Sequence, residues 1–209
     1  MGRPSSPDIM LRFTRRFRSY KIVHDVFCGE QRWIHFAGVC RRNRIGGKMT
    51  RVQVLDLLDR LKIDYRIAEH PPANTVEDID AFHLPDADRI VKNLFLRDEN
   101  KKHYFLLVMQ KDKAANFKEI RSLLGSRPLS FASEEDLFRY LGLKKGAVTP
   151  LGILHDESRK VEVIFDQDLL LYQDIGIHPN ENTATIWLAL ADLVRIIEMH
   201  GNSVRFLHL

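Results

Sequence analysis

The sequence contains little cysteine and no long apolar run. Its 209 residues include two cysteines, Cys28 and Cys40, so residues 49–209 have neither a disulfide framework nor a thiol nucleophile. This usage is typical of a reducing compartment. No apolar run approaches the roughly 18 residues of a membrane-spanning helix. The N-terminus also lacks the apolar segment and small-residue cleavage site of a secretory signal.

Familiar catalytic and cofactor motifs are missing as well. The sequence has no P-loop, GxGxxG, GxSxG, HExxH or CxxC pattern. Nine histidines are present, but none shows the spacing of metal ligands. A metalloenzyme and a hydrolase with a nucleophilic side chain are therefore disfavoured, and we expect neither a metal nor a cofactor.

Charge is distributed unevenly along the chain. Residues 1–48 carry 11 Lys and Arg against 3 Asp and Glu, whereas residues 49–209 carry 21 against 25. Three interpretations of the basic extension stay open: an RNA-binding arm, a targeting peptide, or upstream sequence translated from a misplaced start codon. We favour the last, with Met49 as the initiator, because "GGKM" fits purine-rich codons of a ribosome-binding site. We expect residues 1–48 to lie outside the fold.

From Met49 onward, periodic patterns predict alternating helices and strands. Helices are predicted over 50–61, 74–83, 113–125 and 133–142, and in the second half of 185–201. Strands are predicted over 65–70, 90–97, 103–109, 152–156, 160–166, the start of 185–201, and 203–209, and 169–172 fits a strand or a helical turn. The fold class is α/β or α+β, a single domain at 49–209 with a mixed, barrel-like β core surrounded by helices.

One lysine stands in an otherwise apolar predicted strand. "RIVKNLFL" (89–96) carries Lys92 and Asn93 among apolar residues. Lysine is rarely buried unless a partner compensates its charge. Lys92 is either a strand-end lysine that extends to water or a cation held for an anionic substrate. The stretch alone does not decide between them.

Four segments together resemble a known family. "EHPPANTVED" (69–78), "IVKNLFL" (90–96), "GAVTPLGI" (146–153) and "HPNENTAT" (178–185) occur in the order and spacing of the YbaK/prolyl-tRNA synthetase-associated editing domain. The similarity is greatest to its freestanding alanyl-tRNA(Pro) deacylases, the ProX/PrdX type. It covers residues 49–209 and none of 1–48.

The resemblance implies an enzyme of translation fidelity. Such domains hydrolyse the ester between a wrongly attached small amino acid and the terminal adenosine of tRNA. We therefore expect a cytoplasmic trans-editing deacylase, most simply for Ala-tRNA(Pro). Its partners would be the acceptor end of tRNA(Pro) and, in the cell, prolyl-tRNA synthetase or an elongation factor, with no membrane. Water would attack the ester without a metal or a covalent intermediate.

The resemblance also implies roles for individual residues. Lys92 would anchor the terminal phosphate or ribose, and Asn93, which a strand directs to the opposite face, would contact the adenosine or support the structure. The GxxxP loop from Gly146 to Pro150 would aim N–H groups at the ester carbonyl. The catalytic candidates are Lys92, Gly146 and Pro150. The substrate-binding candidates are Thr75, Asn93, Ala147, Val148, Thr149, His178, Asn182 and Thr183.

Two alternatives stay open. A relative that clears Cys-tRNA or Ser-tRNA would carry the same segments, because the volume of the amino-acid pocket is a three-dimensional property. A non-catalytic module that binds tRNA or the synthetase could also keep the fold. The net charge of residues 49–209 is negative, so tRNA binding would depend on a local basic patch, for which we expect Arg89, Lys92, Lys144 and Lys145.

Overall fold

The structure, a computed structural model, describes residues 49–73 and 75–209. The basic extension expected at 1–48 lies outside the described residues. None of the described helices combines the length and the apolar character that crossing a bilayer requires.

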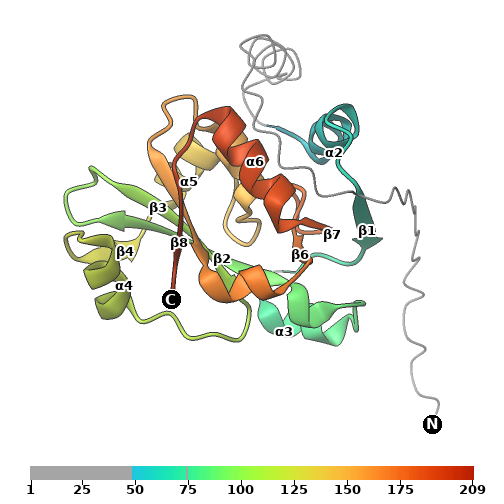
Figure 1. The fold of residues 1–209 in the computed structure, drawn as a ribbon, viewed down its shortest axis with the longest axis horizontal. Coiled ribbons are helices and arrows are strands. Elements are labelled where there is room, and N and C mark those ends of the chain that lie inside the picture. Colours follow the sequence, from blue (N-terminus) through green and yellow to red (C-terminus); the bar gives the residue numbers. More distant parts are fainter. Residues whose placement is uncertain (1–48, 74) are drawn as a thin grey trace.

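A five-stranded mixed sheet forms the centre of the molecule (Figure 1). Its order is β4 (Leu129–Phe131), β2 (Val91–Asp98), β3 (Tyr104–Gln110), β5 (Val161–Asp166) and β8 (Val204–Leu207). Strand β2 pairs antiparallel with both β3 and β4, whereas β3, β5 and β8 run parallel. The prediction of a mixed sheet is confirmed.

A second sheet of three antiparallel strands lies beside the first. Its order is β1 (Tyr65–Glu69), β7 (Ala184–Ala189) and β6 (Asp174–Ile177). One parallel bridge, between Ile90 and Gly176, connects the two sheets. A Cβ at Gly176 would lie 2.8 Å from Cγ1 of Ile90, so this close approach requires glycine. The described strands approach each other there without closing into a barrel.

Local capping explains where the helices begin and end. The helices are α2 (Arg51–Arg60), α3 (Val76–Ala81), α4 (Phe117–Leu124), α5 (Glu134–Leu141) and α6 (Leu190–His200). Threonine or serine side chains cap the first, second and fourth of them, and glycines in the left-handed conformation end the last three. These capping residues are Thr50, Thr75, Ser133, Gly125, Gly142 and Gly201.

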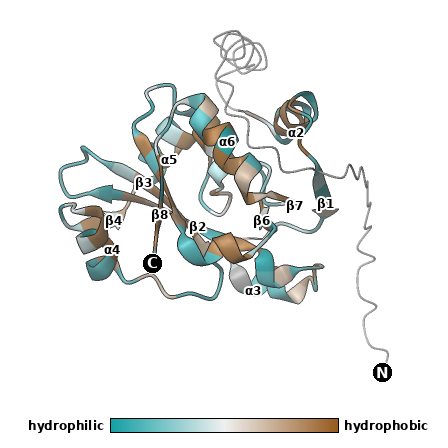
Figure 2. Ribbon diagram, in the orientation of Figure 1, coloured by the Kyte–Doolittle hydropathy of each residue, from teal (hydrophilic) through white to brown (hydrophobic). Residues whose placement is uncertain are grey.

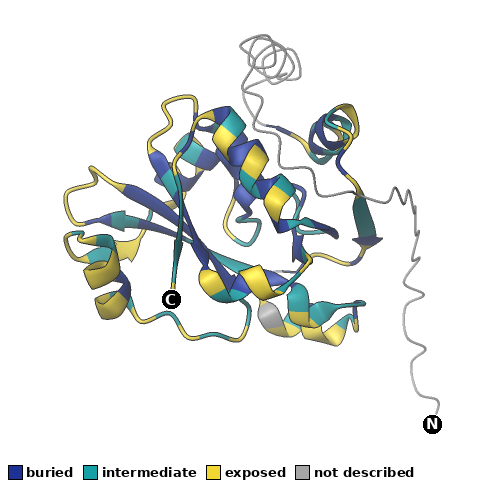
Figure 3. Cartoon of the chain, in the orientation of Figure 1, coloured by how far each residue is buried: buried dark blue, intermediate teal, exposed yellow. Residues whose placement is uncertain are grey.

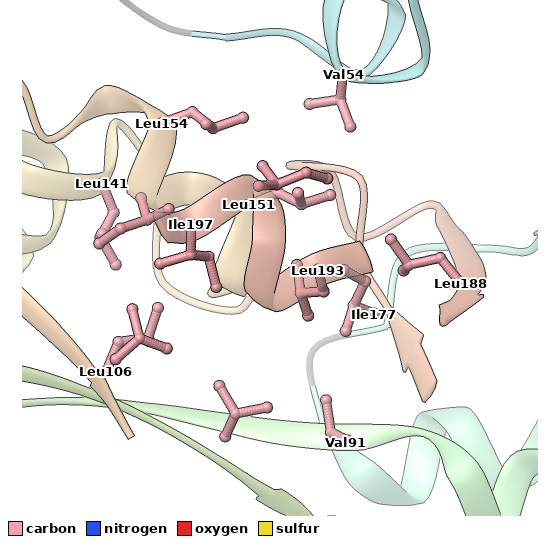
Figure 4. Close-up of a cluster of buried hydrophobic side chains, with 14 of the residues drawn as sticks. Val54, Val91, Leu106, Leu141, Leu151, Leu154, Ile177, Leu188, Leu193 and Ile197 are labelled. Carbon is pink, nitrogen blue, oxygen red and sulfur yellow. The ribbon is translucent and has the colours of Figure 1, made fainter. Parts of the chain in front are cut away.

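Each face of the five-stranded sheet has its own apolar core. On one face, α6 packs Leu193 and Ile197 against residues such as Leu106 and Val91 (Figure 4). On the other face, Ile120 of α4 belongs to a smaller cluster with strand residues of β2, β3 and β5. Figure 2 shows the hydrophobic colouring concentrated on the central strands, and Figure 3 shows them buried while much of α4 is exposed.

The structure corrects one predicted strand and adds two others. Residues 152–156 belong to a 3₁₀ helix, η2 (Pro150–His155), rather than to a strand. Pro150 opens this helix, and a Cβ at Gly152 would lie 2.5 Å from Cδ1 of Leu143, so glycine allows the close packing there. Residues 169–172 fall mostly in another 3₁₀ helix, η3 (Gln167–Leu171), as the helical-turn alternative predicts. The short strands β4 and β6 were not predicted.

Asp156 joins the end of η2 to the sheet. Its buried carboxylate accepts hydrogen bonds from the Val161 N–H at 2.8 Å, Asn202 Nδ2 at 2.9 Å and Ser158 Oγ at 2.6 Å. These bonds connect the segment after the 146–150 loop with β5 and with the approach to β8. Asp156 therefore helps to fix the position of that loop.

We predict that Asp156→Ala lowers the free energy of unfolding by about 2 to 4 kcal/mol, because it leaves buried donors without an acceptor. Urea denaturation measures the change. Glu99→Ala, on the exposed turn between β2 and β3, is the control and should stay within about 0.5 kcal/mol of wild type. Equal stability of the two variants would contradict the role given to Asp156.

Candidate functional site

A pocket of about 300 Å³ lies beside strand β2. Six of the residues predicted for the site line it, and they come from all four segments that carry the family resemblance. They are Thr75, Lys92, Asn93, Gly146, Val148 and His178. The fold therefore brings these distant segments together around one hollow.

The pocket lies where the edge of β2 is not covered by another described strand. Strand β4 pairs only with Leu96–Asp98, and the bridge from β6 is to Ile90, the residue before β2. The Phe95 carbonyl already accepts a hydrogen bond from Ala132 on the β4 side. Because main-chain groups alternate along a strand, the N–H and C=O of Asn93 also point to that side. The gap gives the pocket polar main-chain groups as well as side chains.

Lys92 lies on the face of β2 that carries Leu94 and Leu96 and is partly buried. Its Nζ donates a hydrogen bond to the Lys113 carbonyl. Burial lowers the pKa of Lys92, and the nearby Asp112 carboxylate opposes that shift. No described carboxylate forms an ion pair with this ammonium. It is thus a cation at the rim of the pocket, held by a neutral partner.

Asn93 points to the opposite face, as strand alternation predicts. Its Nδ2 donates a hydrogen bond to the Val148 carbonyl at 3.0 Å. The other amide atom, Oδ1, is buried, and none of the described atoms donates to it. Asn93 therefore connects β2 to the 146–150 loop and has one buried acceptor without a described donor.

The 146–150 loop has a defined shape. Gly146 has a φ of +84°, a conformation that favours glycine. The Ala147 N–H donates to the Lys144 carbonyl at 3.1 Å, so that N–H is already engaged in a turn. The buried Thr149 donates from Oγ1 to the His178 carbonyl at 2.6 Å, and Pro150 is buried at the start of η2. Of the loop residues, Gly146 and Val148 line the pocket.

Two neighbouring histidines are held in the neutral form. His178 Nδ1 lies 3.1 Å from the Ala184 carbonyl, so Nδ1 carries the proton and Nε2 is an acceptor. His70 Nδ1 likewise donates to the Pro71 carbonyl at 2.7 Å, and its Nε2 accepts from Thr185 Oγ1 at 3.0 Å. The ring centroids of the two histidines are 6.1 Å apart. Burial lowers the pKa of both, and each is therefore neutral at pH 7.

Three predicted substrate contacts have structural partners. Thr75 caps α3, accepting from the Asp78 N–H at 3.2 Å, while it also lines the pocket. Asn182 donates from Nδ2 to the Ala73 carbonyl at 3.2 Å. The Thr183 carbonyl accepts from the His70 N–H at 3.0 Å. Asn182 and Thr183 thus fix the pocket wall at 70–73, and they do not line the pocket themselves; the same holds for Ala147, Thr149 and Pro150.

The sequence did not reveal Lys111. Its side chain is 11% exposed, lines the pocket and forms an ion pair with Asp80. The hydrogen bond to Asp80 raises the pKa of Lys111. The residue follows β3, and only the pairing of β2 with β3 brings it beside the pocket. Apolar neighbours complete the wall, among them Ala73, Ile79 and Ile90.

The lysines that line the pocket are not the full set expected for the basic patch. The guanidinium of Arg89 is engaged by Asp174, with Nη1 at 2.8 Å from Oδ1, and the same carboxylate binds Arg66 at 2.9 Å. Arg89 therefore helps to hold β6 against the chain before β2. Lys144 and Lys145 are exposed beside the loop but do not line the pocket. Lys92 and Lys111 are the cations that do.

The profile of the aminoacyl-tRNA editing domain matches residues 70–196 of this chain. The chain belongs to the aminoacyl-tRNA editing domain family. The family predicted from the four segments is therefore confirmed, and so is the expected class of enzyme, an aminoacyl-tRNA deacylase. The matched range includes every pocket residue named above.

Individual relatives agree with this family. The editing domain is 43% identical over 156 residues to the prolyl-tRNA editing protein ProX of Acetoanaerobium sticklandii. The aligned region covers 75% of this chain and 95% of that protein. It is 34% identical over 152 residues to prolyl-tRNA synthetase associated domain-containing protein 1 of Danio rerio, covering 71% and 81%. A solved structure described as a candidate trans-editing enzyme for prolyl-tRNA synthetase has the same fold, with a TM-score of 0.56 at 21% identity, covering 75% and 93%.

The neutral histidines predict how the stability of the editing domain depends on pH. The folded state keeps His70 and His178 unprotonated, whereas in the unfolded chain each binds a proton near pH 6.5. Their contribution to stability is therefore present above about pH 6.5 and is lost as the pH falls below it. Urea unfolding at pH 7.5 and 5.0 should give a lower free energy of unfolding at the acidic pH.

A double variant, His70→Gln with His178→Gln, identifies the source of this dependence. Glutamine does not titrate, so the difference between pH 7.5 and 5.0 should become smaller than in the wild type. An unchanged difference would mean that other groups cause the pH dependence.

Proposed function

We propose that this protein is a trans-editing enzyme that hydrolyses mischarged tRNA, with Ala-tRNA(Pro) as its substrate. The observation that carries the proposal is the convergence of four distant segments on one pocket with two lysines at its wall. The 43% identity to a protein described as a prolyl-tRNA editing protein supports the choice of tRNA(Pro).

In this proposal Lys92 binds the anionic end of the acceptor strand. An ammonium at the rim attracts the phosphate that precedes the terminal adenosine and orients the ester toward the pocket. Its neutral hydrogen-bond partner, the Lys113 carbonyl, leaves the positive charge uncompensated by a carboxylate in direct contact. The nearby Asp112 carboxylate raises the pKa of Lys92 and so favours its charged form, without forming an ion pair with it.

The hydrolysis itself needs no covalent intermediate. A water oxygen attacks the ester carbonyl carbon, and the bond from that carbon to the ribose 3′-oxygen breaks. The 3′-oxygen takes up a proton, which gives free alanine and tRNA. The N–H groups of Gly146 and Val148 would stabilise the negative charge that develops on the carbonyl oxygen.

Proton transfer has two candidate groups. His178 lines the pocket, and its Nε2 is an acceptor in the tautomer that the Ala184 carbonyl fixes. The ribose 2′-hydroxyl of the substrate lies next to the reacting ester and can assist as well. Neither role requires a metal or a cofactor.

Selection between amino acids would be steric. We propose that the wall residues Ala73, Ile79 and Val148 leave room for the methyl side chain of alanine and exclude the bulkier ring of proline. An apolar wall discriminates weakly, by roughly a hundredfold, against a side chain that only adds a hydroxyl. Ser-tRNA and Cys-tRNA therefore remain the substrates to compare with Ala-tRNA(Pro), and a non-catalytic tRNA-binding module is the alternative of another class.

The biological setting follows from the proposed substrate. The enzyme would act in the cytoplasm, where tRNA is charged, and would meet its substrate with prolyl-tRNA synthetase or an elongation factor. We further propose that residues 49–209 contain the whole editing activity and that residues 1–48 add nothing to catalysis. Equal kcat/KM of the chains 1–209 and 49–209 is the expected result.

Incubation of the full chain with a panel of charged tRNAs tests the function. We expect release of alanine from Ala-tRNA(Pro) and little or no turnover of Pro-tRNA(Pro). Faster turnover of Ser-tRNA or Cys-tRNA would assign a different amino acid. Absence of turnover for every tRNA would favour the non-catalytic module.

Lys92→Ala tests the central residue. We predict a fall in kcat/KM for Ala-tRNA(Pro) of at least about 100-fold, because the positioning charge is lost. Urea unfolding should show that the variant is folded. Lys102→Ala, on the exposed turn between β2 and β3, is the matched control and should keep wild-type activity. Wild-type rates for Lys92→Ala would exclude the role of this lysine.

A further inference from the structure

A second and broader hollow adjoins the pocket along β2. It has a volume of about 800 Å³ and shares Lys92 and Leu94 with the smaller pocket. Its remaining wall comes from the segment before α4, from the start of α4 and from β4. The two hollows therefore meet at the lysine to which the proposed function assigns the substrate phosphate.

Two aromatic rings form part of the wall of the broader hollow. Phe117 begins α4 and Phe131 ends β4, and their ring centroids are 5.4 Å apart at an interplanar angle of 63°. Phe131 is 60% exposed, whereas Phe117 also packs on the smaller apolar core. An exposed aromatic ring at the wall of a hollow provides a flat surface on which a nucleotide base can stack.

The charges around these rings suit a polyanion. Lys118 is exposed at the start of α4 and lines the hollow, and Lys92 lies at its other end. The neighbouring acid, Glu119, faces the side chain of Asn116, with Asn116 Nδ2 3.5 Å from its Oε2. The ammonium groups of Lys92 and Lys118 can therefore form ion pairs with the phosphates of a strand that runs along the hollow.

We infer that the surface formed by Phe117, Phe131 and Lys118 binds the single-stranded nucleotides that precede the terminal adenosine of the tRNA acceptor end. The inference rests on the proposed function, which puts the terminal adenosine and its ester in the smaller pocket. The strand must leave that pocket past Lys92, and the aromatic hollow is continuous with it there. Stacking on Phe131 would hold a base, and Lys118 would bind a phosphate.

Stacking of bases on aromatic rings tolerates any sequence, because every base has a π-face. The unpaired 3′ end is the same in all tRNAs, so this surface would contribute affinity rather than a choice between tRNAs. It would also supply binding that the net negative charge of residues 49–209 does not. Selection of tRNA(Pro) would come from contacts elsewhere.

The test measures the dissociation constant of the full chain for a short single-stranded RNA that ends in CCA. Phe131→Ala should raise this constant about tenfold, and Phe131→Trp should restore it because the π-face returns. Phe138→Ala is the matched control: Phe138 is 58% exposed on α5 and lies outside both hollows, so binding should stay at the wild-type level. Lys118→Ala should weaken binding and reduce the salt dependence, by about 0.7 in the logarithmic slope per phosphate lost.

A second measurement separates this inference from the proposed function. Hydrolysis of 3′-O-alanyl-adenosine 5′-monophosphate, which keeps the phosphate proposed to bind Lys92 but lacks the preceding nucleotides, should proceed equally in the wild type and in Phe131→Ala. No hydrolysis by the wild type would refute the proposed function. The dissociation constants for RNA would then decide separately whether the surface binds single-stranded nucleotides. An unchanged dissociation constant in Phe131→Ala would overturn the inference, as would an equal loss in Phe138→Ala. Self-association of the chain that depends on Phe131, without an effect on RNA binding, would overturn it in favour of a dimer contact.

Discussion

The hydrogen bond from Asn93 to the Val148 carbonyl is the contact on which the site depends, because it joins two segments that lie 55 residues apart in the chain. It holds the 146–150 loop against the uncovered edge of β2. Thr149 fixes the same loop to His178 from the other side. A loop held by these two hydrogen bonds, at Val148 and Thr149, can keep its N–H groups oriented before the substrate arrives, which is the condition for electrostatic stabilisation of a transition state.

The electrostatics of the pocket combine cations with neutral rings. Lys92 has a main-chain carbonyl as its partner, whereas Lys111 is neutralised by Asp80. His70 and His178 stay neutral because burial disfavours their charged forms. Partial burial strengthens the attraction of Lys92 for an anion, since fewer water molecules screen its charge. Such an arrangement favours a substrate that brings a phosphate to the rim and an uncharged ester to the interior.

Local signals in the sequence predict much of the fold. Caps such as Thr50 and Gly125 mark helix ends because their hydrogen bonds and backbone angles involve only neighbouring residues. The strands β4 and β6 escaped prediction because they are short, and pairing with distant strands defines them. Lys111 escaped for the same reason: its place beside the pocket follows from the pairing of β2 with β3. The four family segments contain six predicted residues that line the pocket, whereas the hydrogen-bond partners of those residues depend on the tertiary structure.

The most direct measurement is a crystal structure of the full chain with a stable analogue of the reacting end, adenosine that carries alanine through a 3′-amide. The account predicts the alanyl group in the smaller pocket, its carbonyl oxygen within hydrogen-bond distance of the Gly146 or Val148 N–H, and Lys92 beside the ribose. An analogue bound elsewhere on the protein, or an empty pocket at a saturating concentration, would contradict the account.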